Sequence, residues 1–195
     1  MPMRRTGQTR LQLLEAAARL FEERGYKGSS IRDIAGATGT SISNIYHHFG
    51  NKEGLWTEIQ NSSVTDLPRK LRESLQHDAE PLERFKRMLR THLQLADEFR
   101  RESRIFFFNN DRLDSARNDA IRKLQREILD IYVEQVAALR KLGFVRSRHA
   151  TVTVFNILGV MNWFLRWYRP DRKLSARKVQ DEIIAFILRG MGVPE

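Results

Sequence analysis

A run of polar and ionisable side chains lies within residues 41–55, where the sequence reads SISNIYHHFGNKEGL. Tyr46, His47 and His48 are consecutive in this run, and Lys52 follows four positions later. Histidines can bind a metal or move a proton, whereas tyrosine, asparagine and lysine can donate hydrogen bonds to an anion. The residue types therefore allow a metal centre, a catalytic site or a polar surface that contacts another molecule.

The spacing of these side chains argues against the first two kinds of site. Neighbouring residues on a helix point about 100° apart, so His47 and His48 do not readily share one metal ion. The chain has no cysteine, which excludes thiolate metal sites, thiol catalysis and disulfides. No nucleophile–base pair and no phosphate-binding loop are visible in the sequence. We therefore expect no catalytic residues, no metal and no enzymatic activity.

The segment around the polar run predicts two short helices joined by a tight turn. Ser30 is a suitable N-cap for a helix over residues 31–38. Gly39 permits a sharp turn before a helix over residues 41–49, which Gly50 ends. The apolar residues that would hold these helices inward are Ile34, Ala35, Ile45 and Phe49. Such a pair is a helix-turn-helix, whose second helix enters the major groove of DNA.

Helical spacing of apolar residues continues through the rest of the chain. A first helix is expected over residues 10–24, and a fourth begins after Asn51. Further helices are predicted over residues 62–78, 81–99, 115–142, 148–168 and 175–190. Because no strand pair, internal repeat or low-complexity segment is evident, the predicted fold class is all-α.

The N-terminal segment resembles the DNA-binding domain of TetR-family transcriptional repressors over residues 9–56. The resemblance rests on SSIRDIAGATG, on TGTSISNIYHHFGNKEGL and on a preceding amphipathic helix that ends LFEERGY. It implies a three-helix DNA-binding domain over residues 1–56, a fourth helix at about 51–63 as connector, and a helical ligand-binding and dimerisation domain over 64–195. By resemblance, the residues expected to touch DNA are Ser30, Arg32, Ile42, Ser43, Asn44, Tyr46, His47, His48 and Lys52.

A second candidate site lies in the strongly basic segment over residues 139–178, which holds ten basic residues and one acid. Near the end of an apolar helix in this segment, Asn162, Arg166 and Arg169 share one face, with Trp163 beside them. An arginine is costly to bury without a partner. Arg166 therefore pairs with an acid from another helix, lies at an exposed dimer rim, or binds an anionic group of a ligand.

The run MNWFLRWYRPD resembles the C-terminal region of TetR-family regulators of fatty-acid and steroid catabolism, which respond to acyl-CoA thioesters. The resemblance implies an effector with an acyl chain for an apolar tunnel and phosphates for arginines. A hydrophobic drug-like molecule is the alternative effector. The ligand-binding residues expected are Phe106, Phe107, Asn109, Asn162, Trp163, Arg166 and Arg169. The phenylalanines either line the tunnel or belong to the core.

The two C-terminal helices are expected to pair with their copies in a homodimer. The residues expected at that contact are Trp163, Phe164, Phe186 and Ile187 or their neighbours. The most apolar helix, at residues 150–168, holds too many polar side chains to span a membrane, and the N-terminus lacks the apolar segment of a secretory signal.

Together these features predict a cytoplasmic homodimeric repressor that binds a double-stranded DNA operator and a small-molecule effector, with no membrane partner and no cofactor. A DNA-binding protein without sequence preference fits less well. Such a protein depends on many phosphate contacts, and residues 1–60 hold only eight Lys and Arg against six Asp and Glu.

Overall fold

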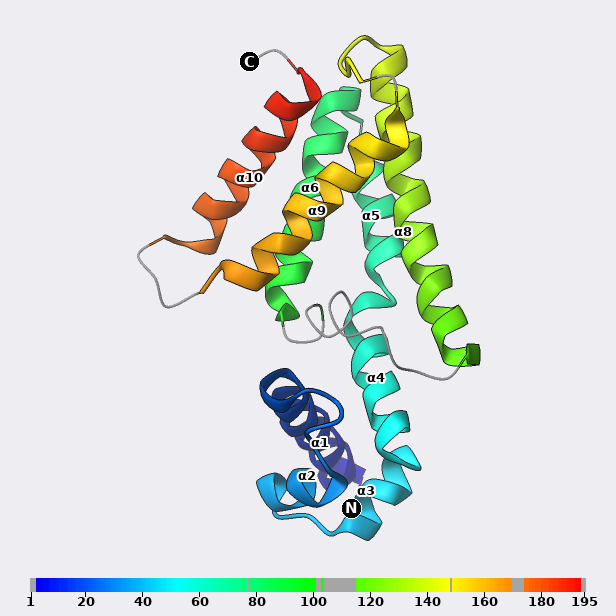
Figure 1. Ribbon diagram of the computed structural model, residues 1–195, viewed down its shortest axis with the longest axis vertical. Helices are drawn as coiled ribbons and strands as arrows, with labels where there is room; N and C mark the ends of the chain where they lie inside the picture. Colours follow the sequence, from blue (N-terminus) through cyan, green and yellow to red (C-terminus); the bar gives the residue numbers. More distant parts are fainter. Residues whose placement is uncertain are drawn as a thin grey trace. The chain divides into compact units, whose positions relative to one another are not determined.

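The computed structural model describes residues 3–76, 78–100, 103, 115–147, 149–169 and 174–193, and only the backbone of 3–9, 60–64, 115–118, 120 and 121. These residues contain helices and no strand, which confirms the all-α prediction (Figure 1). The chain divides into two compact units. The first contains α1 (Met3–Arg24), α2 (Ile31–Thr38), α3 (Ile42–Phe49) and α4 (Lys52–Val64). The second contains α5 (Leu67–Leu75), α6 (Pro81–Glu98), α9 (Ala150–Trp167), α10 (Ala176–Met191) and, from residue 118 onward, α8 (Ser115–Lys141).

An apolar core holds the four helices of the first unit together. Phe21 of α1 lies edge-on to Trp56 of α4, with ring centroids 5.0 Å apart, and Tyr26 lies at the same distance from Trp56. Ile45 and Phe49 bring α3 into the same core. A helix of eight residues is only marginally stable in water, so this burial is what keeps α3 helical.

α1 begins at Met3, and the start predicted at Arg10 is wrong. Residues 3–9 contain no proline, and arginine and glutamine are good helix formers. The helix therefore extends beyond its apolar stripe. Apolar periodicity marks only the turns that face a core, which is why it missed this extension.

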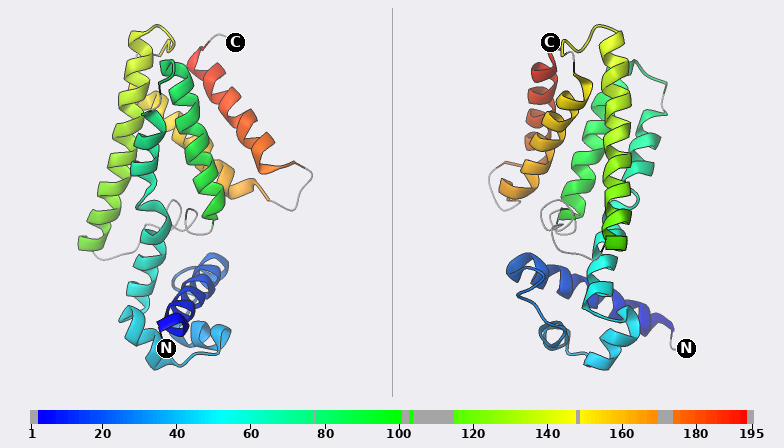
Figure 2. Two further views of the ribbon diagram at one scale, coloured as in Figure 1. Left: turned by 180° about the vertical axis from the view of Figure 1, so that it is seen from behind. Right: turned by 45° about the vertical axis from the view of Figure 1, so that its right-hand side comes forward.

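α6 is the central helix of the second unit and packs against α5, α9 and α10. α9 crosses α6 (Figure 1), and α8 lies beside α5 when the unit is seen from behind (Figure 2). Phe85 and Leu89 of α6, Ile131 of α8 and Phe164 of α9 are all buried. The core of this unit thus draws on helices that are far apart in the sequence.

A buried polar contact joins three helices of the second unit. Nδ1 of His92 on α6 lies 2.8 Å from the hydroxyl of Tyr132 on α8. The same hydroxyl donates to Sδ of Met161 on α9 at 3.7 Å. Burial lowers the pKa of His92 to about 4 and raises the pKa of Tyr132, so both side chains are neutral at neutral pH.

The outward faces of α9 and α10 leave large apolar side chains exposed in the protomer. Trp163 and Phe186 are each 58% exposed, whereas Phe164 and Ile187 are buried in the protomer's own core. The contact between copies stays a prediction. Trp163 and Phe186 lie on the outward face available to it, whereas Phe164 and Ile187 face inward, because a step of one residue turns a side chain by about 100°. The α9–α10 apolar surface comprises Val152, Phe155, Trp163, Trp167, Leu174 and Phe186.

Despite this surface, the described residues include no helix with the length and apolarity needed to cross a membrane.

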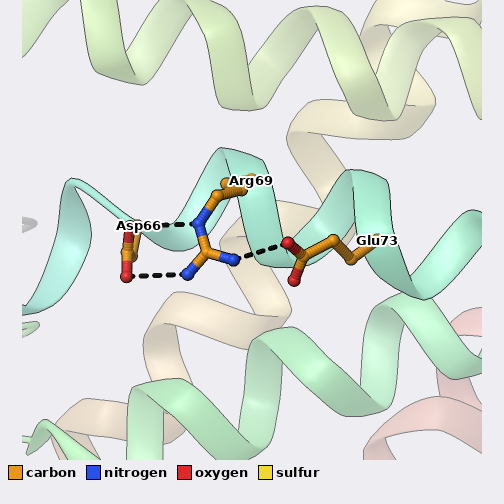
Figure 3. Close-up of polar contacts among 3 residues, drawn as sticks. All are labelled: Asp66, Arg69 and Glu73. Atoms are coloured by element: carbon orange, nitrogen blue, oxygen red, sulfur yellow. Dashed lines mark hydrogen bonds and ion pairs between the residues drawn. The ribbon is translucent and has the colours of Figure 1, made fainter.

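A row of ion pairs lies on the exposed side of α5, where Arg69 is held between Asp66 and Glu73 (Figure 3). Its guanidinium donates to Asp66 at 2.9 and 3.3 Å and to Glu73 at 2.5 Å. The hydrogen bonds and charge of Arg69 lower the pKa of Asp66. All three side chains are more than half exposed, so water screens the pairs and they add little to stability.

The buried imidazole of His92 predicts that acid destabilises the protein. The ordinary pKa of 6.5 applies to His92 in the unfolded chain, while burial lowers the folded value to about 4. Between these values the unfolded state binds the extra proton, so the free energy of unfolding falls as the pH falls. The full loss on going from pH 7 to pH 4 is roughly 3 kcal/mol, measurable by urea unfolding at several pH values.

A His92→Asn variant lacks the titrating ring and should lose less stability than the wild type over the same pH range. His149→Asn, at an exposed position, serves as the control and should keep the wild-type pH dependence. Equal acid sensitivity in His92→Asn and wild type would contradict the prediction.

Candidate functional site

α3 is a short helix whose two ends are fixed by local structure. Ser41 caps its start, because its hydroxyl accepts a hydrogen bond from the backbone N–H of Asn44 at 3.2 Å. Gly39 and Gly50 have φ angles of 66° and 73°, a region that strains residues with a side chain. The two glycines thus allow α2, the turn and α3 to form the helix-turn-helix that the sequence predicts.

α4 approaches the end of α3 closely at Gly54. A Cβ atom at this position would lie 2.0 Å from the carbonyl oxygen of Phe49. The backbone N–H of Gly54 donates to the side chain of Asn51 at 2.7 Å, which caps α4. Only glycine permits this approach, so residue 54 helps to set the position of α3.

The outward face of α3 consists of the side chains left after Ile45 and Phe49 enter the core. Ile42, Ser43, Tyr46 and His47 are exposed, and Asn44 and His48 are half-buried. Short and polar side chains at the start of a helix allow it to approach base edges, and the tyrosine and histidines behind them can reach phosphates. The structure therefore brings together all the α3 residues that the sequence proposes for DNA.

The two histidines of α3 lie next to each other without forming a metal site. Their rings meet edge to face, with centroids 5.4 Å apart. Within the described part of the chain, no group of three His, Cys, Asp or Glu side chains could hold a metal ion.

Ser30 and Arg32 lie at the start of α2. Ser30 and Asp33 form a capping box: the Ser30 hydroxyl accepts from the N–H of Asp33 at 3.1 Å, and the carboxylate of Asp33 accepts from the N–H of Ser30 at 2.8 Å. The Ser30 hydroxyl also donates to the Asp33 carboxylate at 2.6 Å, and this bond and the bond from the Ser30 N–H lower the pKa of Asp33. Arg32 is exposed, so its charge is available to a polyanion.

Lys52 is half-buried at the start of α4. Its ammonium donates to the carbonyl oxygen of Tyr26 and lies 4.2 Å from the centroid of the Tyr26 ring. Burial lowers its pKa, and the charge of Asp33 opposes that shift. Lys52 therefore joins α4 to the segment that links α1 and α2, a structural role that the sequence did not indicate.

The second group of site residues lies near the C-terminal end of α9. Trp163, Arg166 and Arg169 are exposed and Asn162 is half-buried. The guanidinium carbon of Arg166 lies 6.0 Å from the centroid of the Trp163 ring. Because Arg166 is exposed in the protomer, its charge carries no burial cost there. Phe106, Phe107 and Asn109 lie outside the described residues.

The basic side chains that the structure describes within residues 139–178 form two groups at opposite ends of α9. The groups are Arg140, Lys141 and Arg146 before the helix, and Arg166, Arg169, Arg177 and Lys178 at its end and at the start of α10. An 18-residue helix is about 27 Å long, so the first group lies far from Arg166. The basic residues that are counted together along the sequence therefore lie on two separate surfaces of the folded chain.

Two solvent-exposed grooves lie between α9 and α10, and residues of the α9–α10 apolar surface form part of their walls. One, of about 660 Å³, has apolar walls that include Trp167 and Leu174, and its charged lining residues are Lys178, Asp181, Glu182 and Arg189. The other, of about 720 Å³, is lined by residues that include Val152, Phe155, Gly159 and Gly190. Sequence reasoning missed Lys178 and Leu174 as neighbours of Trp167, and the amphipathic pattern of α10 alone could not have identified them.

The chain matches two family models along most of its length. Residues 13–59 match the model for bacterial regulatory proteins of the tetR family, and residues 78–191 match a tetracyclin repressor-like C-terminal domain. The HTH-type transcriptional repressor KstR2 of Mycobacterium tuberculosis is 28% identical over 189 residues, covering 92% of this chain and 91% of that protein. KstR2 of Mycolicibacterium smegmatis is 30% identical over 192 residues, covering 92% and 89%.

Solved structures show the same fold. The structure of the ketosteroid transcriptional regulator KstR2 of Mycobacterium tuberculosis has a TM-score of 0.88 at 26% identity and covers 95% of each chain. AibR in complex with isovaleryl coenzyme A and operator DNA has a TM-score of 0.81 at 27% identity, covering 91% of this chain and 97% of that chain.

The close approach at residue 54 predicts that Gly54→Ala destabilises the first unit. The added methyl group would force α3 and α4 apart, at a cost of about 2 kcal/mol or more. Gly36 in α2 is the matched control, because a Cβ there meets nothing within 4 Å. Gly36→Ala should be neutral or stabilise by up to about 1 kcal/mol. Thermal unfolding followed by circular dichroism compares the two variants, and equal melting temperatures would exclude this role of Gly54.

Proposed function

Because the chain belongs to the TetR family of bacterial transcriptional regulators, we propose that it is a homodimeric repressor that a CoA thioester releases from a two-fold-symmetric operator. The observation that carries the proposal is the outward face of α3, which presents short, polar and aromatic side chains on a helix held by its buried face. A repressor of this kind acts on DNA in the cytoplasm.

In this proposal α3 is the recognition helix. Ile42, Ser43 and Asn44, in its first turn, contact base edges in the major groove. Tyr46 and His47 contact phosphates. Because the N-terminal segment has little excess positive charge, hydroxyls and backbone amides at helix starts share the phosphate contacts with Arg32.

The α9–α10 apolar surface supports the dimer. Six large apolar side chains are exposed there, and soluble monomers rarely expose such a patch without a partner. Phe155 and Phe186 are more than half exposed and also line the grooves, so the same face offers both protrusions and recesses. A self-complementary face suits a two-fold dimer. Such a dimer would present two copies of α3 to successive major grooves, about 34 Å apart.

The end of α9 supports an anionic effector. Arg166 and Arg169 are exposed, and the guanidinium of Arg166 lies near the Trp163 ring. The groove next to Trp167 is lined by Lys178 and Arg189 and also by Asp181 and Glu182. Guanidinium groups pair well with phosphates, and indole rings offer flat surfaces for a nucleotide base. The structural similarity to AibR, which was solved with isovaleryl coenzyme A, supports a CoA thioester as the class of effector. Binding would favour a dimer geometry in which the two recognition helices no longer match the operator.

Tyr46→Ala tests the DNA interface. Tyr46 is 49% exposed, so its loss should leave the fold and the dimer intact while weakening operator binding at least about tenfold. Fluorescence anisotropy with duplex DNA from upstream of its own gene, at fixed salt, measures the affinity, and sedimentation measures the dimer. Lys123→Ala, exposed on α8, is the control and should bind as the wild type does.

Two outcomes would refute the DNA-binding role. Wild-type affinity of Tyr46→Ala would exclude α3 as the recognition helix. Equal affinity of the wild type for a scrambled duplex would favour a DNA-binding protein without sequence preference.

Arg166→Ala tests the effector site. The variant should bind the operator normally but need at least about tenfold more acyl-CoA for release, because a charge-assisted contact to a phosphate is lost. Release is titrated with isovaleryl-CoA, a long-chain acyl-CoA, a steroid-derived CoA thioester and free CoA. Lys141→Ala, at the opposite end of α9, is the matched control and should respond as the wild type does. If no CoA thioester releases the wild type but an uncharged hydrophobic compound does, the alternative effector class is correct.

A further inference from the structure

The guanidinium of Arg100 contacts both the end of α6 and the C-terminal end of α9. Nη1 of Arg100, just beyond α6, donates to the carbonyl oxygen of Tyr168 at 3.3 Å. The guanidinium carbon lies 5.1 Å from the centroid of the Phe164 ring and 4.9 Å from that of the Tyr168 ring. Asp97, one turn earlier, forms an ion pair with the same guanidinium. The Arg100 side chain is only 15% exposed, so these contacts are largely shielded from water.

Arg100 contacts α9 where that helix needs a donor. Tyr168 is the C-cap residue of α9, and carbonyl groups at the end of a helix lack partners within the helix and carry partial negative charge. A planar guanidinium can bond a carbonyl, pair with a carboxylate and lie against aromatic rings at once, which the ammonium of a lysine does less well.

The contact extends from Arg100 to the proposed effector surface. The rings of Phe164 and Tyr168 are stacked with centroids 5.0 Å apart, and the ring of Trp167 meets both edge-on at 6.2 Å. The hydroxyl of Tyr168 donates to the carbonyl oxygen of Leu174 at 3.2 Å, and Leu174 lines the same groove as Trp167. A shift of Arg100 would therefore disturb the wall of that groove.

We infer that Arg100 is a positioning residue for the effector site: it holds the last turn of α9 so that Arg166, Trp167 and Arg169 are presented together to an anionic effector. Arg100 acts through α9, since its guanidinium is already directed to Asp97, Tyr168 and the ring pair. The same contacts make the end of α6 respond when the end of α9 moves. This inference rests on the proposed function for the identity of the effector.

Hydrogen exchange tests the positioning role without any effector. In Arg100→Met, amide exchange within residues 164–168 should be at least about tenfold faster than in the wild type, because the last turn of α9 opens more easily. Arg100→Lys should restore protection in part. Arg90→Met is the matched control: it removes the Arg90–Asp181 pair between α6 and α10, at 2.5 Å, and should leave the exchange of these residues unchanged. Unchanged exchange in Arg100→Met would overturn the inference.

Binding measurements test the link to the effector. Arg100→Met should weaken binding of the acyl-CoA that releases the wild type by about fivefold or more, with operator affinity unchanged. A purely structural role would lower the melting temperature without separating the two affinities, and that result would overturn the inference. If no CoA thioester binds the wild type, the proposed function fails, and the exchange experiment still decides whether Arg100 holds the end of α9.

Discussion

Burial of Ile45 and Phe49 in the core of the first unit is the constraint on which the proposed DNA-binding surface depends. α3 has eight residues and would not persist as a helix in water on its own. The same two side chains fix the rotation of α3 about its axis, because their burial leaves only one face for solvent. The polar run that includes Tyr46 and His47 thus acquires its outward orientation from two apolar residues that are themselves buried. Gly54 belongs to the same constraint, because it lets α4 approach the end of α3.

α9 in the second unit is also oriented by the burial of one face, but its opposite face differs from that of α3. Its inner face, which includes Ile157, Phe164 and Leu165, is buried in the protomer, but its outer face is also apolar and remains exposed. A helix that is apolar on both faces requires a second surface to cover it. The hydrogen bond between His92 and Tyr132 and the contacts of Arg100 fix this helix on its inner side. The outer side is the surface that we propose for association and for the effector.

Local signals predicted the elements well where a cap or a glycine marks the boundary. α2 has the predicted bounds because Ser30 caps it and Gly39 ends it, both through contacts within a few residues. The start of α1 was wrong because Thr9 and Gln12 fit the pattern of a capping box, whereas the helix continues through them and begins at Met3. The excess of basic residues over 139–178 was counted correctly, but it does not form one basic surface. The length of α9 separates the described basic residues into two groups.

The sequence by itself determined the all-α fold, the helix-turn-helix and the residues of α3 that face outward, because these follow from periodicity and capping over short distances. The tertiary structure decided the contacts between residues far apart in the chain. Lys52 lies against Tyr26, and Arg100 lies against Phe164 and Tyr168. Helical spacing shows which residues share a face but not which other helix covers that face. Packing alone therefore assigned Lys52 a structural contact and brought Arg100 to the end of α9.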